Sequence, residues 1–165
     1  MDPAVTPDST PKPASTGGVV FRALFVGIVM AVLGGRMAAP VILAGATSLL
    51  GGSWFGRWFT AAALPAILVA GVALLAGAAV ARVSGARARL GIAAYAALAG
   101  ASGLPQLIEQ FGNAAGDARY AGAAWVTLGN MALAVGCVVL GGWLAAGSHW
   151  SGAAGGTGLP QKEQA

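Results

Sequence analysis

The chain has 165 residues, of which 57% are hydrophobic and only 8% are charged, and its mean hydropathy is +0.76. A soluble domain carries about a quarter of its residues as charged side chains, so this composition excludes a water-soluble globular protein and indicates an integral membrane protein. The formal net charge is +4, but the nine Lys and Arg residues are scattered, which excludes a nucleic-acid partner because no dense basic patch can follow a phosphate backbone.

The first predicted elements are a tail and a long span. Residues 1–18 contain four prolines with Ser, Thr, Asp and Gly, so we expect a disordered tail. The stretch 19–50 is the first predicted transmembrane helix; its 32 residues would reach roughly 48 Å, against a hydrocarbon core of about 30 Å. We therefore expect tilt or a kink near Gly34-Gly35 or Pro40.

Three more apolar segments predict spans at 60–81, 90–111 and 123–146, which places the transmembrane domain at 19–147. Residues 51–59, rich in Trp and Phe, are typical of a short connection at the headgroup level. Residues 148–165 are predicted to be a second disordered tail. The fold class that follows is an all-α integral membrane protein with four transmembrane helices in an up-down antiparallel bundle, since all connections are short.

The basic residues predict the orientation. With four spans, the termini and the loop between spans two and three share one side, which holds Lys12, Arg22, Arg82, Arg87, Arg89 and Lys162. The other side holds Arg57 and Arg119. Because basic residues accumulate on the cytoplasmic side, we expect both termini in the cytoplasm. The heavy use of Ala, Gly and Arg is typical of a GC-rich bacterial gene, so the expected location is a bacterial inner membrane.

Small residues predict a helix-packing face. Gly27, Ala31, Gly35 and Ala39 recur every four residues along the first span, and the stripe Ala73, Gly77, Ala81 does so along the second. Helices associate in lipid where small side chains let their backbones approach closely. The alternative is that such stripes arise by chance in a chain so rich in Ala and Gly.

One group of polar residues within the spans is a candidate site: Arg36, Gln106, Glu109, Gln110 and Asn130. Arg36 and Glu109 lie roughly 26 and 29 Å along their spans from the same side of the membrane. An Arg36–Glu109 pair supported by the amides would form an outward-facing polar site and remove two isolated charges from lipid. Alternatively, Glu109 lies among the headgroups and Arg36 snorkels through a kink at Gly34-Gly35.

The sequence predicts no catalytic residue, metal site or cofactor. It has one histidine, His149, and one cysteine, Cys137, and no Cys/His/Asp/Glu cluster with metal-ligand spacing. The string from Gly34-Gly35-Arg36 to Pro40 resembles a Gly-Gly-Arg…Pro segment of the NnrS family of denitrification-linked membrane proteins. Those proteins are much larger and use histidines for haem and copper, so the resemblance implies neither fold nor cofactor here.

Three functions fit these features. The first is a small accessory or assembly subunit of a bacterial inner-membrane complex, with the lipid bilayer, other membrane subunits or a second copy of itself as partners. The second is a small oligomeric transporter or channel with an outward-facing polar site around Arg36 and Glu109. The third is a membrane enzyme or quinone-linked helper that borrows groups from a partner, although nothing in the sequence argues for an enzyme.

Overall fold

A computed structural model describes residues 15–114 and 116–153, apart from the side chains of residues 118 and 148–153. Within this part the chain is helical, with no strand. Three helical stretches are long and apolar enough to cross a membrane: Thr16–Leu50, Trp54–Ala114 and Arg119–Gly147. The sequence predicts four spans, and the difference arises because helix follows helix without an extended connection between Trp54 and Ala114.

The first helical arm consists of α1 (Thr16–Ala31), a π-helical segment (Val32–Ala38) and α2 (Ala39–Leu50). The Ser15 hydroxyl caps α1 by accepting a hydrogen bond from the Gly18 N–H at 3.2 Å. The helix therefore begins within the predicted tail 1–18, whose residues 1–14 lie outside the described part of the chain. The π-helical segment contains Gly34-Gly35, and such segments are a common cause of bends in long helices.

The second arm begins after a tight turn at 51–53. It consists of α3 (Trp54–Trp58), a second π-helical segment (Phe59–Ala63) and α4 (Leu64–Ser84). Ser53 caps α3 by accepting from the Gly56 N–H at 2.9 Å. The predicted interfacial connection 51–59 is thus mostly helical, because this cap starts a helix six residues before the predicted span at 60.

The chain reverses at Gly85, the one residue with a positive φ (52°) in the described part. This left-handed conformation suits a residue without Cβ, and it lets a short 3₁₀ turn (Gly85–Arg87) lead into α5 (Ala88–Ser102). After Gly103 the chain continues as α6 (Leu104–Ala114), with Pro105 in the first turn, where its missing N–H does least harm. The predicted span 90–111 is therefore two helices.

The last helix, α7 (Ala118–Ala153), packs most extensively against α4, which also contacts α1 and α5. Two glycines allow this packing. A Cβ at Gly77 would overlap the Val138 carbonyl, and a Cβ at Gly141 would overlap the Leu74 carbonyl. The helix runs through residues 148–153 of the second predicted tail, and residues 154–165 of that tail lie outside the described part.

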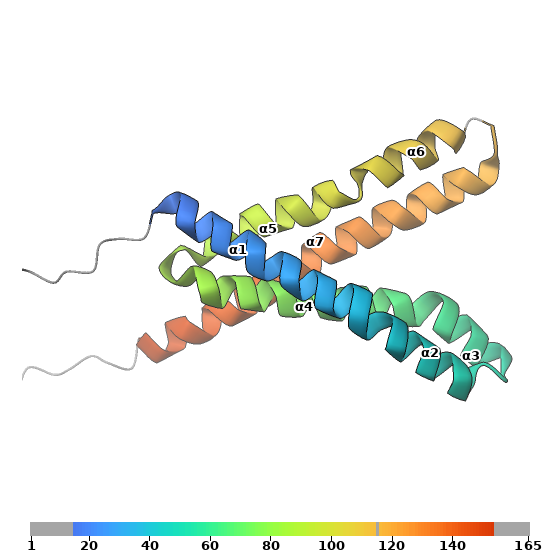
Figure 1. Ribbon diagram of the computed structural model, residues 1–165, viewed down its shortest axis with the longest axis horizontal. Coiled ribbons are helices and arrows are strands. Elements are labelled where there is room, and N and C mark those ends of the chain that lie inside the picture. The colour runs from blue at the N-terminus through green and yellow to red at the C-terminus, as the bar shows by residue number, and fades with distance from the viewer. Residues whose placement is uncertain (1–14, 115, 154–165) are drawn as a thin grey trace, which may run out of the picture.

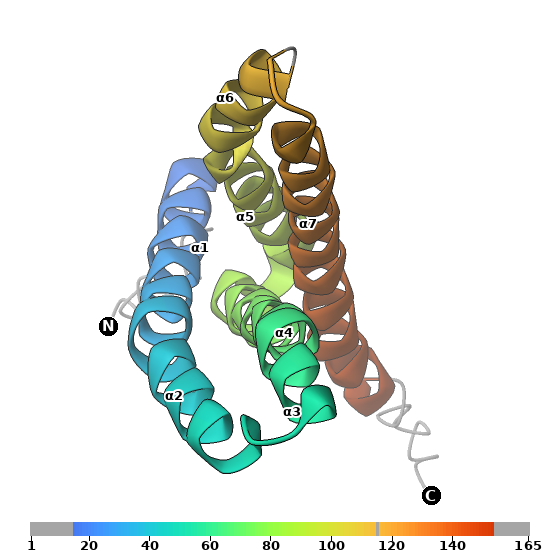
Figure 2. The same cartoon turned by 90° about the vertical axis from the view of Figure 1, so that its right-hand side faces the viewer.

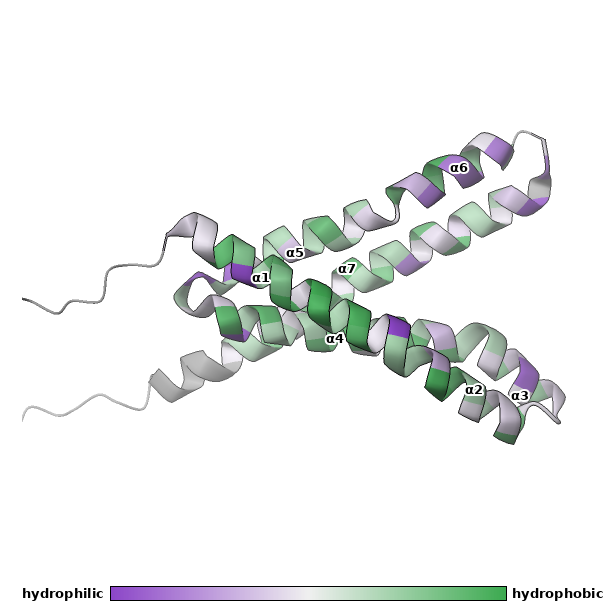
Figure 3. Ribbon diagram, in the orientation of Figure 1, coloured by the Kyte–Doolittle hydropathy of each residue, from purple (hydrophilic) through white to green (hydrophobic). Residues whose placement is uncertain are grey.

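The helices form a fork (Figure 1). The start of α1, the α4–α5 turn and the end of α7 lie at one end; at the other end the α2/α3 pair diverges from the α6/α7 pair, as Figure 2 shows from a second direction. Neither α2 nor α6 has a buried residue. The helices consist largely of hydrophobic residues (Figure 3), many large hydrophobic side chains are exposed, and only 17, 22 and 11% of the most apolar windows of the three long stretches are buried. Exposed apolar surface of this extent is typical of helices that lie in a membrane.

Candidate functional site

The structure does not bring the two candidate charges together. Arg36 lies in the π-helical segment of the first arm and Glu109 lies on α6, and both side chains are exposed. The predicted Arg36–Glu109 pair is not formed, because the two arms diverge at this end of the fork (Figure 1). The ion pair found in the described part of the chain is local: Arg119 Nε lies 3.5 Å from Asp117 Oδ2 at the surface.

Two of the five candidate residues do meet. Gln106 on α6 and Asn130 on α7 line one hollow of about 270 Å³, together with Ser102 and Thr127. This polar notch lies between the α5/α6 segment and α7. Gln110 does not line the notch; its Oε1 atom is buried without a hydrogen-bond partner among the described residues.

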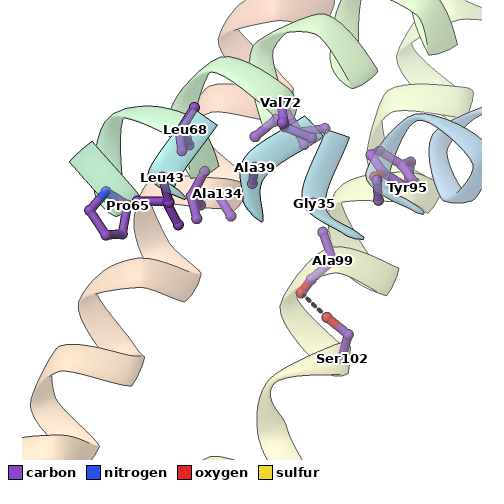
Figure 4. A pocket seen from close by; sticks show the side chains of 14 residues that line it. Gly35, Ala39, Leu43, Pro65, Leu68, Val72, Tyr95, Ala99, Ser102 and Ala134 are labelled. Atoms are coloured by element: carbon purple, nitrogen blue, oxygen red, sulfur yellow. Dashed lines mark hydrogen bonds between the residues drawn. The ribbon is translucent and has the colours of Figure 1, made fainter. Parts of the chain in front are cut away.

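A larger and more apolar cleft lies where the arms of the fork separate, with a volume of about 370 Å³. Residues of α1, α2, α4, α5 and α7 and of the π-helical segment between α1 and α2 line it, and Figure 4 shows several of these side chains. The apolar side chains that line the cleft include those of Leu43, Leu68 and Val72. One side of the cleft is formed by Ala31, Gly35 and Ala39. These last three residues have small or no side chains, and a Cβ built on Gly35 would meet nothing within 4 Å.

The predicted packing face is therefore divided between two environments. Gly27 is buried, and a Cβ there would overlap the ring of Tyr95. Gly34, which is outside the predicted stripe, lies as tightly against Val72. Gly35 is exposed, and a Cβ built on it would meet nothing within 4 Å. One end of the stripe thus packs helix on helix, while the other end lines the cleft.

Tyr95 lines the cleft and is buried. Its side chain is only 6% exposed, and its ring packs against Gly27. Its hydroxyl forms no hydrogen bond within the part of the chain that the structure describes, whereas buried tyrosines usually find a partner. Ser102, in contrast, donates to the Ala99 carbonyl at 2.8 Å (Figure 4).

The polar notch and the apolar cleft are both lined by uncharged side chains. Their lining residues include no Asp, Glu, Lys or Arg. Among the side chains that the structure describes, no three of His, Cys, Asp or Glu converge as metal ligands would. The free Cys137 is half-buried and lines neither hollow. The side chain of His149 lies outside the described part. The arrangement suits binding through hydrogen bonds and apolar contacts.

Sequence reasoning missed Ser102 and Thr127 as parts of the notch. A signal was present, because Ser102 and Gln106 are four residues apart and Thr127 and Asn130 are three apart. Side chains at these spacings share one face of a helix. Two such polar pairs in otherwise apolar segments could have predicted that the faces meet.

The chain was compared with protein-family models, with curated proteins and with solved structures, and no significant match was found in any of the three.

Proposed function

We propose that this protein is a small accessory or assembly subunit of a bacterial inner-membrane complex. The proposal rests on the environment of Arg36. Its guanidinium is exposed, lies midway along a membrane-spanning arm, and has no ion-pair or hydrogen-bond partner among the described residues. Because no described residue of this chain pairs with the Arg36 charge, a residue of another chain is the best candidate for its partner.

The position of Arg36 makes the need for such a partner strong. It lies 14 residues beyond Arg22 and 15 before Gly51, or roughly 21 and 22 Å along a helix. Measured and simulated costs of an arginine at the bilayer centre run from about 2.5 to 17 kcal/mol. A partner helix that presents a carboxylate at this depth would offset the cost. A π-helical segment is also a common feature of functional sites.

The proposed topology has four crossings. The reversal at Gly85 divides the stretch Trp54–Ala114 into two arms that run in opposite directions (Figure 1). Arg22, Arg82, Arg87 and Arg89 then lie at one end of the bundle, where Arg87 Nη1 donates to Thr16 Oγ1 at 2.8 Å. This basic end would be cytoplasmic, together with both termini.

The topology gives the first prediction. Replacing Arg82, Arg87 and Arg89 together by Gln should produce a mixture of orientations, because these residues dominate the charge difference between the two sides. To measure the orientation, a single cysteine is placed at residue 86 or 116 in a Cys137→Ala background. Labelling with a membrane-impermeant maleimide then shows which side of the membrane that residue faces. Labelling of residue 86 from outside in the unaltered Arg background would contradict the proposed orientation.

The function itself is tested by changing Arg36. Arg36→Leu should leave the chain inserted and helical, since the guanidinium forms no contact that holds the fold, yet it should lose most of a co-purifying partner. Arg57→Leu, another exposed arginine but near the end of an arm, is the matched control and should retain the partner. Purification in native nanodiscs with intact-complex mass spectrometry measures both.

Two outcomes would count against an accessory role. One is a partner retained equally by Arg36→Leu and Arg57→Leu. The other is a homo-oligomer of the unaltered chain with no second protein, which would favour the small transporter or channel and move the tests to flux in liposomes.

A further inference from the structure

The start of α1 and the turn from α4 to α5 lie at the same end of the bundle (Figure 1). These segments carry four exposed arginines, which form the basic end: Arg22, Arg82, Arg87 and Arg89. We propose that the basic end binds the phosphate group of one anionic lipid, whose acyl chains lie along the apolar outer face of α1.

A packed junction holds together the segments that carry these arginines. A Cβ at Gly91 of α5 would overlap the side chain of Ser84 at the end of α4, and it would lie 3.2 Å from the Ala23 Cβ on α1. Ala23 and Ser84 are both buried. In the sequence, one arginine stands within two residues of each of these contact residues, so three exposed guanidinium groups surround one junction.

The fourth arginine ties the turn to α1. Arg87 Nη1 donates a hydrogen bond to Thr16 Oγ1 at 2.8 Å. Thr16 is the first residue of α1, so this bond fixes the turn beside the helix that carries Arg22. The acceptor is a neutral hydroxyl, and it therefore leaves the charge of Arg87 uncompensated.

The basic end has no counter-charge within the described part of the chain. The acidic residues described there are Glu109 and Asp117. Glu109 follows Arg89 by 20 residues, about 30 Å along a helical path, and Asp117 pairs with Arg119. Like charges that gather without a carboxylate repel one another, and a bound anion offsets this repulsion.

The depth of the arginines matches the depth of lipid phosphates. Arg82 directly follows the uncharged stretch 60–81, and Arg89 directly precedes the uncharged stretch 90–108. Guanidinium groups bind phosphate oxygens in two parallel hydrogen bonds. Basic residues clustered beside a membrane span are typical of sites for anionic lipids. The basic end therefore presents the right chemistry at the level of the headgroups.

The neighbouring apolar surface favours a lipid over a free phosphate. Phe21 and Phe25 on α1 are 70% and 60% exposed, and their rings stack with centroids 6.4 Å apart. Phe25 lies three residues after Arg22, hence on the same face of the helix and about one turn deeper. A lipid with its phosphate at Arg22 can place an acyl chain on these rings, whereas a free phosphate contacts only the charges.

The experiment titrates the delipidated full chain in uncharged detergent with dioleoylphosphatidylglycerol and counts bound lipids by native mass spectrometry. Dioleoylphosphatidylcholine, which has the same chains and no net charge, is the comparison lipid. Glycerol 3-phosphate supplies the phosphate without the chains. We expect saturable binding of one dioleoylphosphatidylglycerol and about tenfold weaker binding of the uncharged lipid. Equimolar glycerol 3-phosphate should not displace the anionic lipid.

Arginine variants test the place of the phosphate. Arg82→Gln and Arg89→Gln should each weaken the binding about fivefold, the factor expected for one basic residue near an anionic surface. Arg57→Gln is the matched control, because it removes an exposed arginine on α3, at the other end of the bundle (Figure 1), and it should not change the binding.

A second pair of variants tests the place of the acyl chains. Phe25→Ala should weaken the binding about threefold through the loss of apolar contact. Phe55→Ala should have no effect, although Phe55 is similarly exposed, at 63%, and stacks on Phe59 in the same way. Far-ultraviolet circular dichroism checks that every variant remains helical.

Three outcomes would overturn the proposal. The first is equal affinity for the two lipids, and the second is an equal loss with Arg89→Gln and Arg57→Gln. The third is displacement of the lipid by equimolar glycerol 3-phosphate with no effect of Phe25→Ala, which would show that a free phosphate is the ligand. The measurements use this chain alone in detergent, so they depend neither on the accessory role nor on the orientation in the membrane.

Discussion

Gly77→Leu is expected to destabilise the bundle by about 3 kcal/mol, the upper part of the range for overpacked cores. The reason is geometric, because the Cβ of any residue at this position would overlap the backbone carbonyl of Val138 on α7. A backbone group cannot rotate away as a side chain can. The most extensive helix contact of the molecule, between α4 and α7, would have to open. Unfolding in mixed micelles, followed by far-ultraviolet circular dichroism against the fraction of denaturing detergent, measures the loss.

The control for this variant lies on the same helix. Gly71 on α4 has open space where its Cβ would be, so Gly71→Leu should leave the stability unchanged or raise it by up to about 1 kcal/mol through helix propensity. The reciprocal contact gives an independent pair: Gly141→Leu should be as damaging as Gly77→Leu, whereas Gly136→Leu, also open, should not. Equal effects at the packed and open glycines would show that α4 and α7 do not approach in this way.

Gly27→Ala is expected to cost about 2 kcal/mol, because its methyl group would press on the ring of Tyr95. In a Tyr95→Ala background the same substitution should cost nearly nothing, so the two residues should show a coupling energy of about 2 kcal/mol. Both values come from detergent unfolding of the four proteins of a double-mutant cycle.

Gly35→Ala is the matched comparison for Gly27→Ala, because Gly35 lies about two turns farther along the same stripe. Its added methyl group meets nothing within 4 Å, so we expect no loss and a gain of up to about 1 kcal/mol from helix propensity. If Gly27→Ala and Gly35→Ala have the same effect, the stripe is a uniform packing face, and its division between helix contact and cleft is wrong.

Residue counting along single helices predicted the depth of the candidate site residues but not which of them lie close together. Counting residues places Arg36 and Glu109 at similar depths, and each helix does carry them towards the same end of the fork. Depth is one coordinate, however, and whether two helices converge or separate at that depth depends on their crossing angle. The π-helical segment at Val32–Ala38 and the reversal at Gly85 set the paths of the arms, and the two charges end up apart. Gln106 and Asn130 meet because α6 and α7 are adjacent.

The sequence by itself determined that this chain is helical and that its helices are long and apolar enough to cross a membrane. That follows from composition and from runs of apolar residues, which are local properties. It also predicted that small residues mediate packing, and the α4 stripe at Ala73, Gly77 and Ala81 is indeed buried. The number of crossings and their orientation remain predictions of the sequence.

Only the tertiary structure decided which small residues are packed and which line a hollow. Gly27 and Gly35 belong to the same four-residue stripe, yet Gly27 lies under Tyr95 and Gly35 lines the cleft. The difference arises because α1 packs against α5, whereas the π-helical segment packs against α4 through Gly34 and leaves Gly35 facing the cleft. These contacts join helices that are far apart in the sequence, so the cleft could not be predicted from local sequence patterns.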